Sequence, residues 1–435
     1  MKDKVTVFWF RRDLRLSDNK GLSAALQSGF PVLPIFIFDP NILEKLTDKY
    51  DRRVDYIHQA LQALQKDLVA KGGDIRVFHA DPLEVFKQLH KDYEIASVYG
   101  NRDYEPEAIK RDEAVERWLN SKDIPLVTAK DQVIFERNDI LKADGTPYSV
   151  YTPYSRKWKE KLEDKHHRAA IMKTDHLLPL DKKQLPSLAS IGFEKTDMRY
   201  EKPQLDAGII DDYGEQRDFP AKDHTTRLGI ALRFGTISVR ACVQFALKHN
   251  ATWLGELIWR EFFMQILAHF PQVVKQSFKP QYDHIAWRND EDDFQRWCAG
   301  ETGYPLVDAG MRQLNETGFM HNRVRMVVAS FLTKHLLIDW RWGEAYFAEK
   351  LLDYELSSNN GNWQWAAGCG CDAAPYFRIF NPSEQTKKFD KDLAYIKVWN
   401  PDFESLTKEP VVKHEFARER ALKIYKKALD KNREG

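Results

Sequence analysis

The chain has 435 residues, of which 43% are hydrophobic, and its 66 basic and 65 acidic residues leave a net charge of +1. This length fits two large domains or three domains of about 150 residues. The balanced charge excludes a uniformly basic surface, so any surface for nucleic acid must be local. Four cysteines are too few for a disulfide scaffold, and no apolar run approaches the ~18 residues of a membrane span. We therefore expect a soluble, intracellular (cytoplasmic) protein.

The first 130 residues alternate between apolar runs of strand length and amphipathic segments. The runs occupy residues 4–10, 31–38, 74–80, 94–100 and 124–129. Between the second and third runs, Val54, Ile57, Leu61, Leu64 and Leu68 recur at spacings of three and four, as in a helix. Residues 82–93 and 105–119 fill the later gaps. The pattern predicts a Rossmann-like α/β domain with a parallel sheet, which binds ligands at the carboxyl ends of its strands.

The usual phosphate-binding loops are absent from the sequence. The first strand is followed by "RRDLRLSDN" and not by a Gly-x-Gly-x-x-Gly turn, and no Gly-x-x-x-x-Gly-Lys-Ser/Thr motif occurs. Residues 131–200 mix Pro, Ser and Gly with charge, which is typical of a long connector. Residues 201–435 have mostly helical spacing, so we predict a second, all-helical domain there.

Residues suited to binding chemistry are concentrated in the helical part. Glu256, Trp259 and Arg260 lie at i, i+3 and i+4 and share one helix face. Asn322 and Met326 repeat the i, i+4 spacing. Each group alone is more easily explained by a salt bridge or a core aromatic. Together they supply flat faces, cations and hydrogen-bonding groups, which suit a planar heterocycle with phosphates or stacked nucleobases.

Two tryptophans stand one residue apart in "NNGNWQWAAGCGC". Trp363 and Trp365 would point about 200° apart on a helix, so we expect them to line different cavities. The nearby Cys369 and Cys371 have no second closely spaced Cys/His pair to complete four ligands, so no metal site is expected.

Long, unusual strings in this sequence resemble the photolyase/cryptochrome flavoprotein family. They are "VFWFRRDLRLSDN", "LIWREFF", "TGYPLVDAGMRQLNETGFMHNRVRM" and "NNGNWQWAAGCGCDAAPYFRIFNP", and the likeness extends over nearly the whole chain. The resemblance implies an antenna domain at 1–130, a linker at 131–200 and an FAD-binding catalytic domain at 201–435. It is greatest to the photolyases that split cyclobutane pyrimidine dimers in DNA, using light and reduced FAD. We therefore expect damaged DNA as the partner and a monomeric enzyme.

The resemblance also assigns roles to individual residues. The FAD-contact positions are Tyr213, Thr225, Thr226, Arg227, Leu228, Gly229, Trp253, Arg260, Arg325, Asp353, Glu355 and, beside flavin N5, Asn359. The lesion pocket corresponds to Glu256, Trp259, Asn322, Met326 and Trp365, with Arg323 as a neighbouring DNA contact. The electron chain from flavin to surface corresponds to Trp363, Trp340 and Trp287. Glu256 would hydrogen-bond the damaged base, provided that it is protonated or its charge is compensated.

Some positions depart from the family pattern and leave alternatives open. Gly229 stands where relatives commonly have Ser, Glu355 replaces an Asp, and Phe319 replaces a frequent Trp. Glu107 and Ala108 stand where some folate-binding relatives carry Asn-Glu, so a folate, a deazaflavin, another antenna chromophore or none is possible. A (6-4) photolyase would place histidines at Asn322 and Met326. A plant-type cryptochrome photoreceptor would carry Asp at Asn359.

Overall fold

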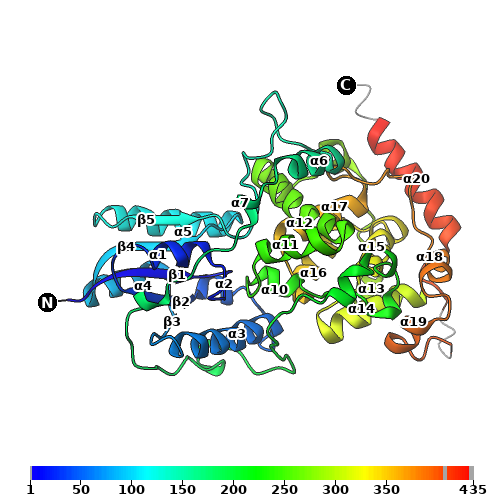
Figure 1. The fold of residues 1–435 in the computed structure, drawn as a ribbon. Helices are drawn as coiled ribbons and strands as arrows, with labels where there is room; N and C mark the ends of the chain where they lie inside the picture. Colours follow the sequence, from blue (N-terminus) through cyan, green and yellow to red (C-terminus); the bar gives the residue numbers. More distant parts are fainter. Residues whose placement is uncertain (1, 405–408, 431–435) are drawn as a thin grey trace. The chain divides into compact units, whose positions relative to one another are not determined.

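The computed structural model describes residues 2–404 and 409–430, which form two compact units (Figure 1). The N-terminal unit contains residues 1–139, 161–205 and 227–248. The helical unit contains residues 140–160, 206–226 and 249–435. Each unit is therefore assembled from three separate stretches of the chain.

A five-stranded parallel sheet forms the centre of the N-terminal unit. Its strands are β1 (Lys4–Phe10), β2 (Val32–Phe38), β3 (Arg76–His79), β4 (Glu94–Asn101) and β5 (Leu126–Ala129). The order is β3-β2-β1-β4-β5, so the direction of winding reverses between β1 and β4. The central strands β1 and β2 are buried almost throughout, which is why they appear in the sequence as continuous apolar runs. The five predicted strands are confirmed.

Helices cover both faces of this sheet. Its longer helices are α1 (Lys20–Ala25), α3 (Arg52–Val69), α4 (Pro82–Asp92), α5 (Pro106–Asn120), α10 (Gly229–Arg233) and α11 (Val239–His249); α2 (Pro40–Leu43) and α7 (Asp164–His167) are single turns. Phe8 and Phe10 of β1 pack with α1 and α3, whereas Val7 and Trp9 pack with α4 and α5. The α/β fold predicted for this part of the chain is confirmed.

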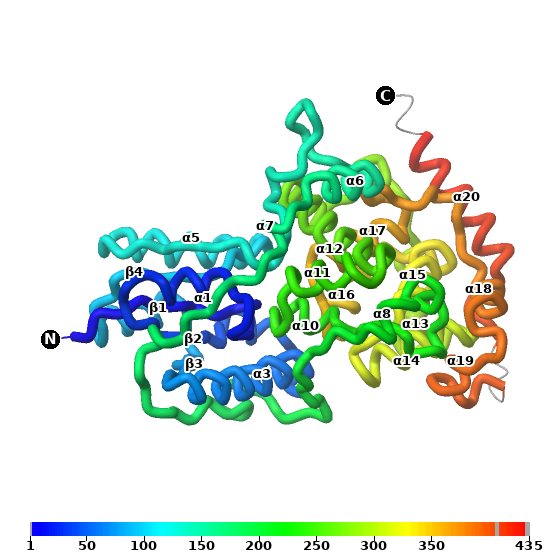
Figure 2. Tube along the Cα trace, in the orientation of Figure 1, coloured from blue at the N-terminus to red at the C-terminus, as the bar shows by residue number. Residues whose placement is uncertain are grey.

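The second unit is built of helices (Figure 2). Their buried apolar side chains form a second core. The helices are α6 (Tyr151–Lys161), α8 (Ala207–Asp211), α9 (Tyr213–Gln216), α12 (Ala251–His269), α13 (Glu291–Ala299), α14 (Pro305–Thr317), α15 (Asn322–Ser330), α16 (Trp340–Lys350), α17 (Leu356–Ala367), α18 (Pro382–Phe389), α19 (Ala394–Trp399) and α20 (His414–Asp430). A π-helical turn at Phe331–Leu336 extends α15. Helix α17 packs against α12, α15 and α16, so these four helices form the framework of the site described below.

The segment at 131–200 differs from the expected loose connector. It contains α6 and α7; residues 131–139 and 161–200 belong to the N-terminal unit, whereas residues 140–160 belong to the helical unit. Helix α6 forms because Tyr151, Tyr154 and Trp158 recur at spacings of three and four and share one apolar face. Charged residues and Pro153 obscured this short pattern in the sequence.

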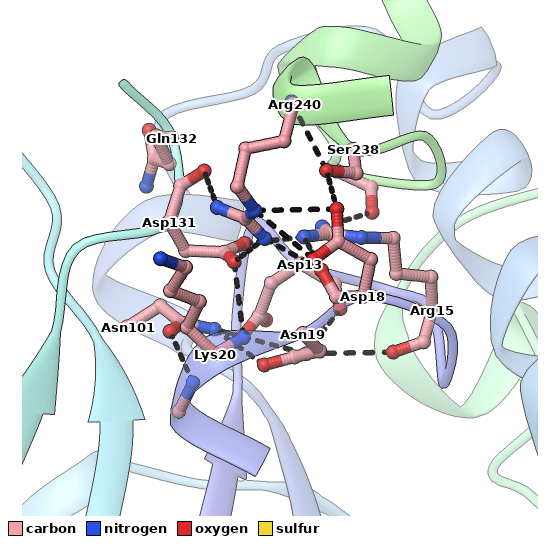
Figure 3. Close-up of polar contacts among 12 residues, drawn as sticks. Asp13, Arg15, Asp18, Asn19, Lys20, Asn101, Asp131, Gln132, Ser238 and Arg240 are labelled. Atoms are coloured by element: carbon pink, nitrogen blue, oxygen red, sulfur yellow. Dashed lines mark hydrogen bonds and ion pairs between the residues drawn. The ribbon is translucent and has the colours of Figure 1, made fainter. Parts of the chain in front are cut away.

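Residues 227–248 lie in the N-terminal unit, although they fall within the range predicted for the helical domain. The reason is a buried ionic cluster (Figure 3). Arg240 donates to Asp131 Oδ1 at 2.7 Å and to Asp18 Oδ1 at 3.0 Å, and Arg15 donates to Asp131 Oδ2 at 2.6 Å. Burial alone would raise the pKa of Asp131, but the two guanidinium groups lower it below its ordinary value.

Among residues 2–404 and 409–430, none of the helices combines the length and the apolar character that crossing a membrane requires.

Candidate functional site

A cavity of about 100 Å³ opens between α15, α16, α17 and the loop that precedes α17. It is lined by Asn322, Arg325, Met326, Ala329, Phe347, Leu351, Asp353, Tyr354, Glu355, Ser358, Asn359, Asn362, Trp363, Trp365 and Ala366. Eight of the predicted site residues are among them: Asn322, Arg325, Met326, Asp353, Glu355, Asn359, Trp363 and Trp365. The structure therefore brings together positions from three segments of the chain that the sequence singled out separately.

The two tryptophans of α17 line this same cavity, contrary to the expectation of two cavities. The side chains of Trp363 and Trp365 differ by about 200° when the rotation around the helix axis is counted one way, and by about 160° when it is counted the other way. Ser358, Asn359, Asn362 and Ala366 project within that 160° arc and also line the cavity. Trp363 and Trp365 therefore lie at the two edges of one broad face. Trp363 is buried, whereas Trp365 is partly exposed.

An ion pair crosses one side of the cavity from α15 to the loop before α17. Arg325 donates through both terminal nitrogens to Asp353, at 3.2 and 3.0 Å, and its Nε donates to Met320 O at 2.7 Å. This fork fixes the guanidinium plane, because all three donating groups are oriented. Arg260 of α12 approaches Glu355 at 4.0 Å, so the helix that carries Glu256 and Trp259 also reaches the cavity wall.

Asn359 is held by a carboxyl group that the sequence did not indicate. Its Nδ2 donates to the backbone oxygen of Glu344 at 3.0 Å and to Glu344 Oε1 at 2.9 Å. Burial raises the pKa of the Glu344 carboxyl, while the hydrogen bond from Asn359 partly opposes this rise. With the amide nitrogen oriented toward Glu344, the position of the amide group beside the cavity is fixed.

Trp363 is packed tightly in the helical core. Its ring contacts Phe347 with a centroid distance of 5.0 Å and Trp297 at 6.1 Å. Trp340 and Trp287, the other members of the expected electron chain, belong to the same core, and Trp287 is partly exposed. In the described part of the chain the aromatic neighbours of Trp363 are Phe347 and Trp297, and neither belongs to a motif that could be recognised in the sequence.

Glu256 and Trp259 of α12 form a neighbouring cluster and do not line the cavity. Arg217, just after α9, makes an ion pair with Glu256, and its guanidinium lies 5.8 Å from the ring centroid of Tyr213. Burial raises the pKa of Glu256, and the charge of Arg217 opposes that rise. Arg217 therefore supplies the positive charge that was expected to compensate Glu256. In the sequence, the only indication of Arg217 is its position four residues after Tyr213, the spacing of neighbours on one helix face.

The remaining predicted residues are placed as follows. Arg323 donates to Asp218 at 2.7 Å, and its guanidinium stacks 4.2 Å from the ring centroid of Phe389. Trp253 is buried on α12. Thr225 and Thr226 end one stretch of the helical unit, whereas Arg227, Leu228 and Gly229 begin a stretch of the N-terminal unit. A shared role for the segment 225–229 thus stays a prediction.

Family models match both units. Residues 6–173 match the model described as DNA photolyase, and residues 253–432 match the FAD binding domain of DNA photolyase. The deoxyribodipyrimidine photo-lyase of Synechococcus sp. is 39% identical over 425 residues, covering 91% of this chain and 87% of that protein. The protein of the same name from Halobacterium salinarum is 36% identical, covering 98% of this chain and 99% of its own length.

Solved structures agree with these matches. A class III photolyase from Agrobacterium tumefaciens superposes with a TM-score of 0.87 at 34% identity, covering 98% of both chains. An archaeal photolyase from Sulfolobus tokodaii with two FAD molecules has a TM-score of 0.85 at 32% identity, covering 97% of this chain and 99% of its own. A Synechocystis cryptochrome has a TM-score of 0.84 at 25% identity, covering 98% and 99%. This chain therefore belongs to the DNA photolyase family of FAD-binding proteins.

Proposed function

We propose that this protein repairs DNA in the light by splitting cyclobutane pyrimidine dimers. The observation that carries the proposal is the cavity shared by Asn322, Met326 and Trp365 with the Arg325–Asp353 ion pair and Asn359. Its lining combines oriented polar groups with flat or apolar surfaces. Its relatives from Synechococcus sp. and Halobacterium salinarum carry the name of the same activity.

The residues of the cavity fit a flavin. Asn359 and the Arg325–Asp353 pair present hydrogen-bonding groups for the polar edge of a planar ring system, and Ala329, Phe347 and Trp363 present apolar walls. In this proposal the same residues hold FAD, which, when reduced and excited by light, supplies the electron for ring opening. The protein's part is to bind and orient the reactants and to exclude water from the cavity.

The substrate would reach the site as an extruded lesion. Flipping a damaged base pair out of a duplex costs a few kcal/mol, least where stacking is already weakened. Stacking on Trp259 and Trp365 would recover about 1–3 kcal/mol per base. The ion pair with Arg217 allows Glu256 to remain beside a polar base edge without an uncompensated charge.

An exposed aromatic residue extends this DNA interface. The Phe377 side chain is 62% exposed, on the segment that follows α17. This segment is anchored, because Lys334 Nζ donates to Arg378 O at 2.9 Å and Tyr376 stacks on Tyr425 with a centroid distance of 5.9 Å. Apolar side chains on rigid supports are suited to filling the gap left by unstacked bases. Arg323, once released from Asp218, would contact a phosphate.

We further propose that Trp363, Trp340 and Trp287 carry electrons between the cavity and the surface. Trp340 is 1% exposed, and within the described residues its indole Nε1 has no hydrogen-bond acceptor. A proton cannot leave an oxidised Trp340 easily in such surroundings, so the hole would pass on to the partly exposed Trp287.

A second chromophore is also part of the proposal, although its chemical class is open. The relative from Sulfolobus tokodaii contains two FAD molecules. Glu107, which stands with Ala108 where some folate-binding relatives carry Asn-Glu, pairs with Lys110 on the surface of α5, with both side chains 72% exposed. Extraction of the purified protein followed by mass spectrometry would identify a folate, a deazaflavin or a second FAD.

The decisive experiment uses DNA that contains both kinds of ultraviolet lesion. The FAD-loaded, reduced protein is illuminated with this DNA, and each lesion is counted with a lesion-specific antibody, with a dark sample as control. We expect cyclobutane dimers to disappear only in the light and (6-4) photoproducts to persist. Loss of (6-4) photoproducts alone would contradict the proposed substrate. Retention of both lesions by a flavin-loaded protein would favour a photoreceptor, as the similarity to the Synechocystis cryptochrome allows.

A further inference from the structure

Helix α6 is fastened to α12 along its whole length. Tyr151, Tyr154 and Trp158 lie on one face of α6. The ring of Tyr154 packs against Phe262 with a centroid distance of 5.1 Å. At the next contact, Trp158 Nε1 donates to Glu261 Oε1 at 2.7 Å in buried surroundings. The segment expected to be a connector thus forms a fixed support for the helix that carries Glu256 and Trp259.

Tyr151, at the start of α6, makes the closest aromatic contact of this support. Its ring lies parallel to the indole of Trp259, with a centroid distance of 3.7 Å and an interplanar angle of 5°. Its hydroxyl donates to Gly255 O at 2.8 Å, and its backbone nitrogen donates to Asp372 Oδ2 at 3.1 Å. The stacking contact and the hydroxyl hydrogen bond hold the phenol ring in place. The Trp259 indole also contacts Phe262 and Phe263 of its own helix, at centroid distances of 5.6 and 5.5 Å, so Tyr151 is the partner that α6 contributes to a ring held from more than one side.

The two contacts that Tyr151 makes with α12 lie on either side of Glu256 in the sequence. Gly255 precedes Glu256 directly, and Trp259 follows it by three residues on the same helix. Burial raises the pKa of the Tyr151 hydroxyl above its ordinary value, and a hydrogen bond with Ser155 opposes part of this rise. The hydroxyl therefore stays protonated and remains a hydrogen-bond donor to Gly255 O. One side chain from α6 thereby contacts the backbone beside Glu256 and stacks on Trp259, two of the five residues that are assigned to the lesion.

We propose that Tyr151 is a positioning residue for substrate binding, which holds the Trp259 indole in the orientation that stacks on a damaged base. This inference rests on the proposed function, because it concerns the lesion-binding role of Trp259. An indole that is already ordered loses less conformational freedom when the lesion arrives. Stacked aromatic pairs contribute an amount that corresponds to about 2- to 13-fold in an equilibrium constant.

Three variants separate the role of the ring from that of the hydroxyl. Tyr151→Leu removes the stacking surface, Tyr151→Phe keeps it and removes the hydroxyl, and Tyr148→Leu is the matched control. Tyr148 contacts Tyr154 with a centroid distance of 6.4 Å and makes no ring contact with Trp259 among the described residues. For each FAD-loaded protein, the dissociation constant is measured with dimer-containing DNA and with undamaged DNA of the same sequence, and the FAD content is determined.

We expect Tyr151→Leu to bind dimer-containing DNA about 2- to 13-fold more weakly, with unchanged affinity for undamaged DNA and unchanged FAD content. Tyr148→Leu should bind the damaged DNA as the wild type does, and Tyr151→Phe, which keeps the stacked ring but loses one of its anchors, should bind it more tightly than Tyr151→Leu does. In a Trp259→Leu background, Tyr151→Leu should have no further effect, since the indole it positions is gone. If Tyr151→Leu loses FAD, Tyr151→Met fills the volume without a planar ring and takes its place.

The results distinguish the inference from the function on which it rests. A wild-type protein that binds damaged and undamaged DNA equally would contradict both. A wild type that prefers damaged DNA, combined with a Tyr151→Leu variant of unchanged affinity, would overturn the positioning role alone. An equal loss of affinity for both DNAs would also overturn it, because this result indicates general damage to the fold.

Discussion

The contact between Gly343 and Trp363 provides a test of the packing around the cavity. A Cβ atom added at Gly343 of α16 would lie closer than 3.0 Å to two ring carbons of Trp363 and to Leu332 Cδ2. Gly343→Ala should therefore overpack the core, which typically costs about 1–3 kcal/mol. The better helix propensity of alanine offsets about 1 kcal/mol of this cost. The net loss is up to about 2 kcal/mol, or a fall in Tm of up to about 8 °C for a unit of this size.

The same substitution, Gly343→Ala, is expected to change stability in the opposite direction in a protein that carries Trp363→Phe. Trp363→Phe removes the outer ring carbons that a Cβ at Gly343 would meet, and the terminal methyl group of Leu332 can move into the space. In that background Gly343→Ala should stabilise the protein by about 1 kcal/mol, the propensity difference alone. Thermal unfolding of the four FAD-loaded proteins, followed by flavin release, measures both effects. If Gly343→Ala stabilises the protein equally in both backgrounds, Trp363 does not lie against α16 as described.

Three further substitutions test other parts of the site. Burial raises the pKa of Glu344 above its ordinary value of 4.5, so the wild type should lose stability as the pH rises above that value. Glu344→Gln should remove this loss. The measurement is the free energy of unfolding of both proteins between about pH 5 and about pH 8, and an equal dependence on pH in the two proteins would refute the role of Glu344. Trp363→Phe should slow light-driven flavin reduction without preventing dimer splitting by pre-reduced protein; unchanged reduction would remove Trp363 from the electron path. Trp259→Ala should weaken binding of damaged DNA roughly 5- to 150-fold in a filter-binding assay, and equal binding would argue against base stacking.

Local patterns in the sequence were sufficient for the parallel sheet and its helices in residues 1–130, whereas most of the cavity residues were assigned through the family resemblance. β1 and β2 are buried on both sides, and α3 carries a regular apolar stripe, so each element could be predicted from its own residues. Asn322 and Met326 share a face of α15 in the same way. Their spacing placed them on one helix face, and both line the cavity, whereas their role in lesion binding was implied by the family resemblance and stays a prediction.

Partners that are distant in sequence could not be predicted in this way. Glu344 is recognisable only through its hydrogen bond with Asn359, fifteen residues later and on another helix. Arg217 lies 39 residues before Glu256, and Tyr151 lies more than 100 residues before Trp259. The face shared by Trp363 and Trp365 depended on what surrounds α17 on all sides. These features follow from tertiary packing, which no short window of sequence contains.

The buried cluster around Asp131 affects how the chain matures during synthesis. Asp131 receives hydrogen bonds from Arg15, which precedes it, and from Arg240, which is 109 residues further along. At translation rates of about 5–20 residues per second, Arg240 emerges roughly 5–20 s after Asp131. Until then the nascent sheet has a carboxylate without its second cation, so the N-terminal unit cannot reach its final state while the ribosome is still in the first half of the message. A pause or a chaperone acting between these two residues would therefore affect the yield of the N-terminal unit more than a pause after residue 248.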